Sequence, residues 1–254
     1  MKAIKKKLRS LLKFNEINLT SGEIASNSKI QNSRITGEIK IANHAIINDS
    51  TMSGKIRIGS NAQIDSAKLS GQIELGDNVR LIDGTSLNGK ISIGRNTSIN
   101  GPNTDLTSAI NQIEIGNFCS IARNVTFQEF NHDFSKMTSY FIHRNLINDG
   151  VRNDIISKGN IRLGNDVWVG THCVILSGVT IGTGAVIAAN SVVLSDIPPY
   201  AIAAGSPAKI LKFRFQPNVI AQLLASNWWE LPKDELINFY HRFDPESGFK
   251  KEAI

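Results

Sequence analysis

The chain has 254 residues, with 28 lysine and arginine residues against 22 aspartate and glutamate residues, and a formal net charge of +6. Residues 1–14 hold six of the basic residues and no acidic one, so the remaining chain is neutral, with 22 bases and 22 acids. A neutral body argues against a nucleic-acid-binding protein. No apolar run reaches about 18 residues and the N-terminus lacks a secretory signal, so a cytoplasmic location is expected.

Residues 1–19 form a basic amphipathic segment. Its apolar residues fall on one face of a helix, at Ile4, Leu8, Leu11 and Leu12. Such a segment can lie on an anionic membrane surface, which would hold the protein at the inner membrane face. It can also serve as a short capping helix over the open first turn of the repeat that follows, and this second interpretation is preferred.

Residues 20–205 carry a repeat with the period of a parallel β-helix. Similar segments open with a large apolar residue, the first five of them 17 or 18 residues apart, at Ile24, Ile41, Ile58, Leu75, Ile93 and Ile115. Hexapeptides later open at Leu163, Val169, Ile175, Ile181, Ile187 and Val193. A period of six fits neither a helix nor a simple alternating strand, whereas three hexapeptides make one triangular turn. The repeat therefore predicts an all-β fold, a parallel β-helix of about eight coils, with Gly, Asn and Asp at corners that need positive φ.

Residues 128–157 interrupt this repeat. No hexapeptide can be traced within them, although the pattern resumes afterwards. A loop of this length inside a regular solenoid is usually functional, so an extruded active-site loop is expected. His132 lies where the loop leaves the repeat, and a neutral imidazole there can take a proton from a hydroxyl or an amine near pH 7. Asp133, Glu129 or a backbone carbonyl are the candidates for orienting this imidazole.

Several segments in combination resemble one protein family. They are Asn131-His132 and residues 161–171, 178–193 and 198–209. The chain resembles the hexapeptide-repeat acyltransferases, in the branch of type B chloramphenicol and streptogramin A acetyltransferases and related polysaccharide sugar O-acetyltransferases. Residues 206–254 resemble the C-terminal helical cap of that branch. The resemblance implies a left-handed coil, acetyl-CoA as the acyl donor, and a homotrimer that binds the donor in the groove between neighbouring prisms.

The resemblance also implies roles for individual residues. His132 matches the general base of the family, and Trp168 matches an aromatic residue that flanks the donor. Thr171 and Ala189 match positions that contact the pantetheine arm, where a small residue permits close backbone approach. The structural alternatives are corner packing for Trp168 and coil filling for Ala189.

Lys209 and Lys212 match basic positions near the adenosine 3′-phosphate of the donor, which needs a cation. The alternative is an ordinary solvated face. Leu194 and Ser195 depart from the family pattern, because several relatives carry a lysine there. Donor binding is therefore expected to depend more on Lys209 and Lys212.

Asn131, Tyr140 and Phe141 are expected to contact the acceptor from the loop. The segment around Tyr140 looks more like enzymes that acetylate sugars of bacterial surface polysaccharides than like the antibiotic-modifying relatives. The leading interpretation is O-acetylation of a sugar hydroxyl in a surface polysaccharide or its precursor. An N-acetyltransferase acting on a nucleotide-linked amino sugar, and a xenobiotic acetyltransferase for chloramphenicol or streptogramin, remain alternatives.

Two further function classes share this fold. A γ-type carbonic anhydrase needs three zinc-binding histidines, and His132, His143 and His172 do not have its spacing, so no metal is expected. A scaffold that kept the fold and lost the chemistry is the non-enzymatic alternative, against which the pair Asn131-His132 argues. Cys119 and Cys173 occupy small inward positions of hexapeptides, so they are expected in the core.

Overall fold

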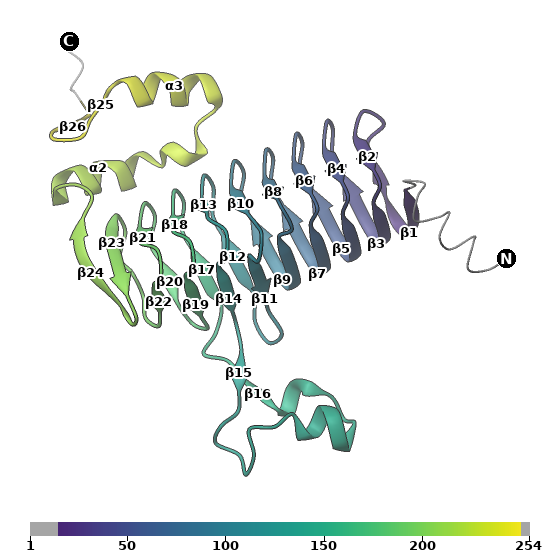
Figure 1. The fold of residues 1–254 in the computed structure, drawn as a ribbon. Helices are drawn as coiled ribbons and strands as arrows, with labels where there is room; N and C mark the ends of the chain where they lie inside the picture. The colour runs from purple at the N-terminus through teal and green to yellow at the C-terminus, as the bar shows by residue number, and fades with distance from the viewer. Residues whose placement is uncertain (1–14, 250–254) are drawn as a thin grey trace.

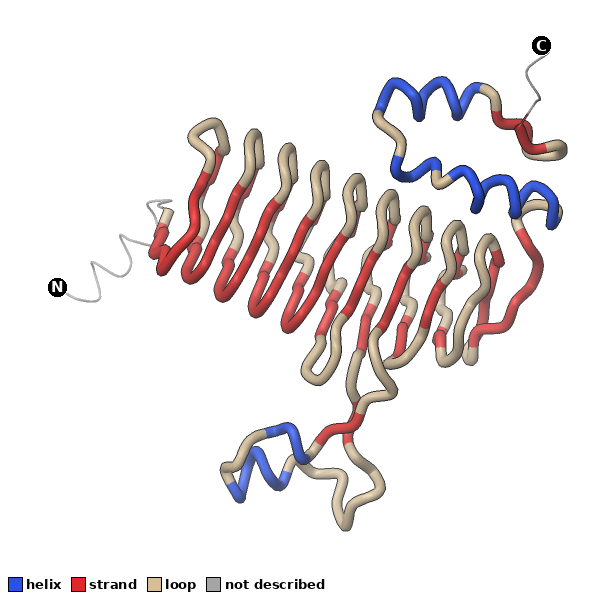
Figure 2. Tube along the Cα trace, turned by 180° about the vertical axis from the view of Figure 1, so that it is seen from behind, coloured by secondary structure: helices blue, strands red, loops and turns tan. Residues whose placement is uncertain are grey.

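The computed structural model describes residues 15–249, and they form an elongated parallel β-helix with a projecting loop and a C-terminal cap (Figures 1 and 2). The parallel β-helix expected from the hexapeptide repeat is thus confirmed, whereas its left hand stays a prediction. The predicted amphipathic helix within residues 1–14 lies outside the described residues.

Two parallel sheets run the length of the prism. The first follows the order β1 (Glu16–Ile24), β3 (Arg34–Ile41), β5 (Thr51–Ile58), β7 (Lys68–Leu75), β9 (Ser86–Ile93), β11 (Asp105–Thr107), β14 (Thr126–Gln128), β19 (Val174–Leu176) and β22 (Val192–Val193), with β12 (Ile113–Ile115), β17 (Ile161–Leu163) and β20 (Thr180–Ile181) branching from β9. The second contains β2 (Lys29–Gln31), β4 (Ile46–Asn48), β6 (Gln63–Asp65), β8 (Arg80–Ile82), β10 (Ser98–Asn100), β13 (Ser120–Ile121), β18 (Trp168–Val169), β21 (Val186–Ile187), β23 (Ala201–Gly205) and β24 (Ala208–Phe213).

The first sheet folds along a line of glycines, so the prism has three sides. In each long strand from β3 to β9 the chain bends at a glycine with φ between 109° and 117°, at Gly37, Gly54, Gly71 and Gly89. A Cβ atom at Gly54 would lie 2.3 Å from the carbonyl oxygen of Gly71 in the next turn, so the bend tolerates no side chain. We call the strand halves before the bend, with β11, β14, β19 and β22, side A. The halves after it, with β12, β17 and β20, are side B, and the second sheet is side C.

The core is a set of apolar columns that run along the inside of the prism. The side-B column contains the repeat openings, all buried, at Ile41, Ile58, Leu75, Ile93, Ile115, Leu163 and Ile181. Each turn closes the apolar face of the one before it, which a single turn could not bury alone. Cys119 and Cys173 are both unpaired and buried in this core, as expected. Burial raises the pKa of the Cys119 thiol to about 12, so this cysteine is no nucleophile at neutral pH.

The coil count is higher than the sequence predicts. The solenoid has about ten turns, whereas the repeat openings predict about eight. β1 ends at the first traceable opening, Ile24, and so adds no turn. At the C-terminal end, however, Ile197 pairs with Ile181 and β23 at Ala201–Gly205 follows, beyond the last counted opening. Terminal turns face solvent on one side, so their inward residues are under less pressure to be large and apolar, and the repeat fades there.

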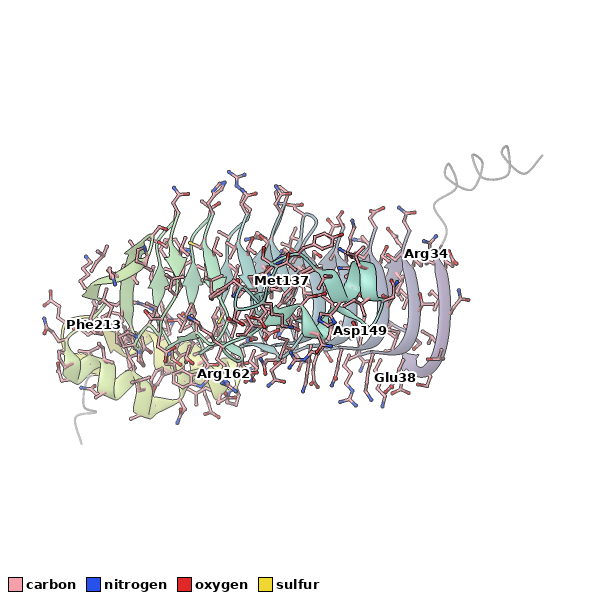
Figure 3. All side chains as sticks on the ribbon, turned by 90° about the horizontal axis from the view of Figure 1, so that it is seen from below. Arg34, Glu38, Met137, Asp149, Arg162 and Phe213 are labelled. Carbon is pink, nitrogen blue, oxygen red and sulfur yellow. The ribbon has the colours of Figure 1, made fainter. Side chains whose placement is uncertain are left out.

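The segment between β14 and β17 leaves the prism at the edge between sides A and B, which we call edge AB. It contains β15 (Asn131–His132), the π-helix η1 (His143–Ile147), the 3₁₀-helix η2 (Val151–Asn153) and β16 (Ile155–Ile156). β15 and β16 pair antiparallel and form the stem of the loop, which hangs below the prism in Figure 1. Figure 3 shows the loop from below, with Met137 near its middle and Asp149 toward the N-terminal turns that carry Arg34 and Glu38.

The C-terminal region opens with a strand rather than a helix. β24 runs antiparallel to β23, and the cap follows as α2 (Pro217–Ser226), η3 (Trp228–Glu230), α3 (Lys233–His241) and the short hairpin of β25 (Phe243–Asp244) and β26 (Gly248–Phe249). The Arg95 guanidinium fixes this cap to the edge between sides B and C by donating to the carbonyls of Trp229 and Leu231, at 2.7 and 2.9 Å. Among residues 15–249 no helix has the length and apolar character required to cross a membrane.

Candidate active site

His132 stands on the stem of the projecting loop. It pairs with Ile155 across the antiparallel ribbon, and its side chain is exposed. Its Nδ1 atom lies 2.5 Å from the carbonyl oxygen of Ser139, a contact within the loop. Because a carbonyl can only accept a hydrogen bond, Nδ1 carries the proton and donates it. When the ring is neutral, this contact leaves the lone pair on Nε2, which is the form that a general base requires.

Phe141 holds the His132 ring from one face. The two ring centroids are 4.1 Å apart and the planes differ by 15°, so the rings are stacked. The sequence predicts Phe141 as an acceptor contact, and the structure adds this direct contact with the candidate base. Tyr140, also predicted to contact the acceptor, is 54% exposed, and Asn131 is exposed on the stem beside His132.

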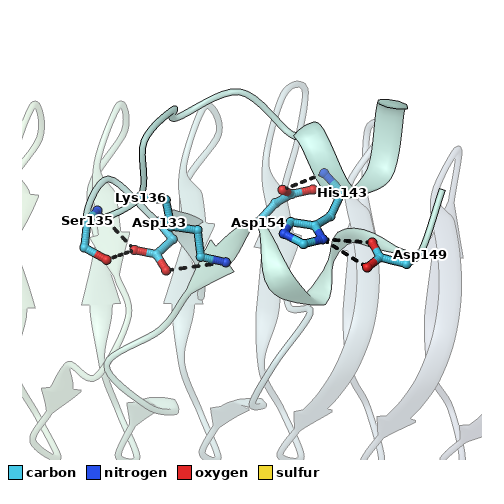
Figure 4. Close-up of polar contacts among 6 residues, drawn as sticks. All are labelled: Asp133, Ser135, Lys136, His143, Asp149 and Asp154. Atoms are coloured by element: carbon cyan, nitrogen blue, oxygen red, sulfur yellow. Dashed lines mark hydrogen bonds and ion pairs between the residues drawn. The ribbon is translucent and has the colours of Figure 1, made fainter. Parts of the chain in front are cut away.

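The two carboxylates near His132 in the sequence are engaged elsewhere. The Asp133 carboxylate accepts hydrogen bonds from the hydroxyl and the N–H of Ser135, which lower the pKa of Asp133, and it lies 3.8 Å from the Lys136 ammonium (Figure 4). Glu129 is buried at the base of the loop and accepts from the N–H groups of Ala109 and Ile110, each at 2.9 Å. Of the candidates for orienting His132, the structure therefore selects a backbone carbonyl.

Trp168, Thr171 and Ala189 form a continuous strip on a different part of the prism. Trp168 lies on side C in β18 and is 55% exposed. Thr171 follows at the edge between sides C and A, which we call edge CA, where its hydroxyl donates to the carbonyl of Arg123 at 2.8 Å. Ala189 lies one turn further along the same edge, where the N–H of Asn190 donates to the carbonyl of Thr171. Trp168 thus offers a flat, exposed indole near this edge, where Ala189 carries only a methyl group.

Lys209 and Lys212 extend this strip toward the C-terminal end. On β24, Lys212 pairs with Ile202 and Lys209 pairs with Ala204. Ile202 in turn pairs with Val186, which pairs with Trp168, so Lys212 belongs to the row that starts at Trp168. Both lysines are exposed. The five residues predicted to bind the donor thus share side C and edge CA, with an aromatic surface at one end and two cations at the other.

The structure does not bring His132 to this strip within one chain. The loop leaves from edge AB, whereas the strip follows side C and edge CA, and side A lies between the two edges. In Figure 1 the loop projects away from the prism. One chain therefore supplies the candidate base and the candidate donor strip at separate places.

Two residues of the loop contribute contacts that the sequence does not predict. Ser139 acts through its carbonyl group, which every residue carries, so no side-chain signal marks it. Asp154 is a buried aspartate in a mostly exposed loop, and its carboxylate accepts the N–H groups of His143 and Arg144. The only sequence signal for a buried carboxylate here is its position directly before the apolar pair Ile155-Ile156.

A cavity of about 550 Å³ lies elsewhere, between the cap and the edge joining sides B and C. Its walls include Phe118, Tyr200, Arg214 and Trp228, and the predicted site residues do not line it. In the part of the chain that the structure describes, no group of three or more His, Cys, Asp or Glu side chains is placed to hold a metal ion.

Several proteins similar to this chain are named as acetyltransferases. The family model for the bacterial transferase hexapeptide (six repeats) matches residues 160–195. A probable macrolide acetyltransferase of Lysinibacillus sphaericus is 36% identical over 145 residues, which cover 54% of this chain and 79% of that protein. The chain belongs to the hexapeptide-repeat acyltransferase family.

Two other similar proteins extend the comparison. The chloramphenicol acetyltransferase of Morganella morganii is 36% identical over 133 residues, 50% of this chain and 63% of that enzyme, so the match spans less than two thirds of this relative. The crystal structure of the polysialic acid O-acetyltransferase OatWY shares 25% sequence identity, covers 79% of this chain and 89% of its own, and has a TM-score of 0.52. The matches confirm the resemblance derived from the motifs.

Proposed function

We propose that this protein is an acetyl-CoA-dependent acetyltransferase that O-acetylates a sugar hydroxyl of a bacterial surface polysaccharide or its precursor. The observation that carries the proposal is the state of His132, whose Nδ1 is bound by the Ser139 carbonyl and whose Nε2 is left free on an exposed loop. Family membership supports acyl transfer, because the relatives are named as acetyltransferases. The geometry supports a general base rather than a structural histidine.

The proposed reaction is a direct transfer. The Nε2 atom of His132 accepts the proton of the acceptor hydroxyl while the hydroxyl oxygen forms a bond to the carbonyl carbon of the thioester. The carbon–sulfur bond then breaks, and the departing thiolate takes the proton from His132. The products are an acetyl ester and free CoA thiol, and His132 returns to its starting form.

The donor strip supports acetyl-CoA as the donor substrate. Trp168 offers a flat apolar surface, and the small Ala189 leaves the edge open to a narrow chain. Lys209 and Lys212 supply positive charge at the far end, where the phosphates of CoA need cations. The cofactor roles predicted for these residues and for Thr171 are thus retained in the proposal.

We propose a homotrimer in which the loop of one copy meets the donor strip of its neighbour. A second copy supplies what one chain lacks, since His132 and the strip lie at different edges of the same prism. The loop also exposes large apolar side chains, with Phe134 at 83% and Met137 at 94% exposure. Such side chains are commonly covered by a partner. A cytoplasmic location, where acetyl-CoA is available, is part of the proposal.

A xenobiotic acetyltransferase is the second candidate, favoured by relatives that are named for chloramphenicol and macrolides. The polysialic acid O-acetyltransferase supports a glycan acceptor instead. The two candidates share the donor and the base and differ only in the acceptor. An N-acetyltransferase acting on a nucleotide-linked amino sugar would use the same base.

The test is release of free CoA thiol from acetyl-CoA with a panel of acceptors. The panel contains oligosaccharides, nucleotide-linked amino sugars and chloramphenicol. We expect sugar-dependent release that falls by about 100-fold or more in His132→Ala. His241→Ala, which removes an exposed histidine at the end of α3, serves as the matched control and should retain full activity. Release with chloramphenicol alone would select the second candidate, and absence of acetyl-CoA binding would favour the scaffold.

A further inference from the structure

Asp154 is a buried carboxylate inside the exposed loop. Only 4% of the residue is accessible to solvent, although most of the surrounding loop is exposed. Its two oxygens accept the backbone N–H groups of His143 and Arg144, at 3.0 and 2.9 Å. These two residues open the π-helix η1, and Figure 4 shows the contact with His143. Asp154 therefore caps η1 from a distant point of the chain, using both carboxylate oxygens.

The backbone of Asp154 is joined to the strand that carries His132. Its carbonyl accepts the N–H of Asp133 at 2.9 Å, and the next residue, Ile155, pairs directly with His132. The N–H of Asp154 donates to the carbonyl of Val151, which fixes the approach of the chain from η2. One residue thus touches both the stem with the candidate base and the start of η1.

The start of η1 in turn determines what surrounds the imidazole. The carbonyl of Phe141 accepts the N–H of Asn145 at 2.9 Å, which ties Phe141 to the first turn of η1. The Phe141 ring stacks on His132, and the Ser139 carbonyl binds its Nδ1. A shift of the first turn of η1 would therefore displace Phe141, and with it the chain that carries the Ser139 carbonyl two residues earlier.

The Asp154 carboxyl favours its charged form, which accepts hydrogen bonds at both oxygens. Burial opposes ionisation, but the N–H groups of Arg144 and His143 outweigh it and lower the pKa of the Asp154 carboxyl, with smaller help from the charges of His143 and Lys136. The side chain of His143 is directed to Asp149, at 3.0 Å from its carboxylate oxygens, so it does not compete for Asp154.

We propose that Asp154 is a positioning residue for the catalytic base: it clamps the first turn of η1 to the β15–β16 stem and thereby keeps His132 protonated on Nδ1 with Nε2 free. The inference rests on the proposed function, in which His132 is the base. Asp154 itself touches neither the acceptor nor the donor strip.

The test compares Asp154→Asn with Asp149→Asn. Asparagine keeps the size of the side chain but replaces one acceptor oxygen with an NH₂ group, which cannot bind a backbone N–H. We expect kcat for thiol release to fall about tenfold or more, with KM for acetyl-CoA unchanged, because a misplaced catalytic group costs rate rather than donor binding. Asp149→Asn alters a carboxylate of the same loop that binds only a side chain, and its kcat should stay near that of the wild type.

Nitrogen-15 NMR of the His132 imidazole gives a readout independent of turnover. The signals are assigned by their loss in His132→Gln. The wild type should show a protonated Nδ1 and a free Nε2, and Asp154→Asn should show a mixture of tautomers. Identical tautomer spectra and identical kcat in wild type and Asp154→Asn would overturn the proposal. A tautomer shift in Asp154→Asn together with no turnover by the wild type would leave the positioning role intact and reject the proposed reaction.

Asp154→Glu separates positioning from a general loss of loop structure. Glutamate restores the carboxylate on a chain one methylene longer, so it should recover part of the lost kcat and of the wild-type tautomer signal. Circular dichroism should show the same unfolding temperature for the β-helix in all three proteins, because the loop lies outside the core. An Asp154→Glu protein at least as impaired as Asp154→Asn in both readouts would contradict the specific role of the carboxylate.

Discussion

Single residues on this prism owe their chemistry to the groups that surround them. The His132 imidazole contacts a carbonyl through one nitrogen and an aromatic ring on one face, and the proposed proton transfer depends on both. The lysines of β24 differ in this respect. Lys209 and Lys212 are exposed, so their contribution to binding depends on a charged ligand that reaches them.

Replacing both lysines should weaken donor binding, because the variant loses the cations proposed to pair with the 3′-phosphate. For Lys209→Ala/Lys212→Ala we expect KM for acetyl-CoA to rise by about 3- to 30-fold, since each exposed ion pair is worth up to about 1 kcal/mol. Acetyl-dephospho-CoA, which lacks the 3′-phosphate, is the matched substrate, and its KM should be the same in wild type and variant. An equal increase in KM for both donors would show that the 3′-phosphate is not the partner of these lysines.

Among the elements, the base of the loop is held by Glu129. Its carboxylate accepts from the N–H groups of Ala109 and Ile110 and from the Asn111 amide, each at 2.9 Å. Burial raises the pKa of the Glu129 carboxyl, but these donors and the Ser157 hydroxyl outweigh it, so the pKa falls below its ordinary value of 4.5. Ser157 precedes the return of the chain to β17, so Glu129 joins the departure and the return of the loop.

Glu129→Gln should destabilise the protein in a pH-dependent way. Because the folded-state pKa is depressed, the stabilisation by the carboxylate is fully present above the unfolded pKa, near 4.5, and is lost as pH falls through the folded value. At pH 7 we expect a loss of about 1 to 3 kcal/mol in the free energy of unfolding, and a difference that shrinks toward zero in strong acid. Urea unfolding at several pH values measures it, and a difference independent of pH would contradict the assigned charge.

The whole molecule presents a regular prism with its chemical groups at separate edges. His132 belongs to edge AB, and the donor strip belongs to side C and edge CA. In a closed ring of identical copies, an edge of one prism meets a different surface of the next, so each interface can combine one base with one strip.

Mixing two inactive variants tests this arrangement. His132→Ala lacks the base, and Ala189→Trp fills the donor strip with a large ring on an exposed position. Each variant alone should be inactive. Unfolding and refolding them together at equal amounts should restore about a quarter of wild-type activity, as random assortment at each interface predicts. No recovery, with both variants still assembling into mixed trimers, would place the base and the strip of one active site in the same copy.

The hexapeptide repeat made the fold predictable, because every turn of a solenoid must present the same apolar pattern to its neighbours. Ile41, Ile58 and Leu75 open three successive turns in the sequence and stack as one buried column in the structure. The number of turns was less accessible, since the end turns are freed from that requirement. His132 was selected because it lies where the loop leaves the repeat and because Asn131-His132 matches the resembled family; its role as the base stays a prediction.

The sequence by itself determined the parallel β-helix and the existence of the projecting loop, whereas the five donor-binding residues were predicted only through the family resemblance. Tertiary structure alone decided how the loop folds around His132. The Ser139 carbonyl, rather than Asp133 or Glu129, binds the imidazole. Asp154 clamps η1 to the stem. Both contacts join irregular segments of the chain. A repeat encodes its contacts through periodicity, whereas a loop has no period, so its hydrogen bonds are fixed only when the chain is folded in three dimensions.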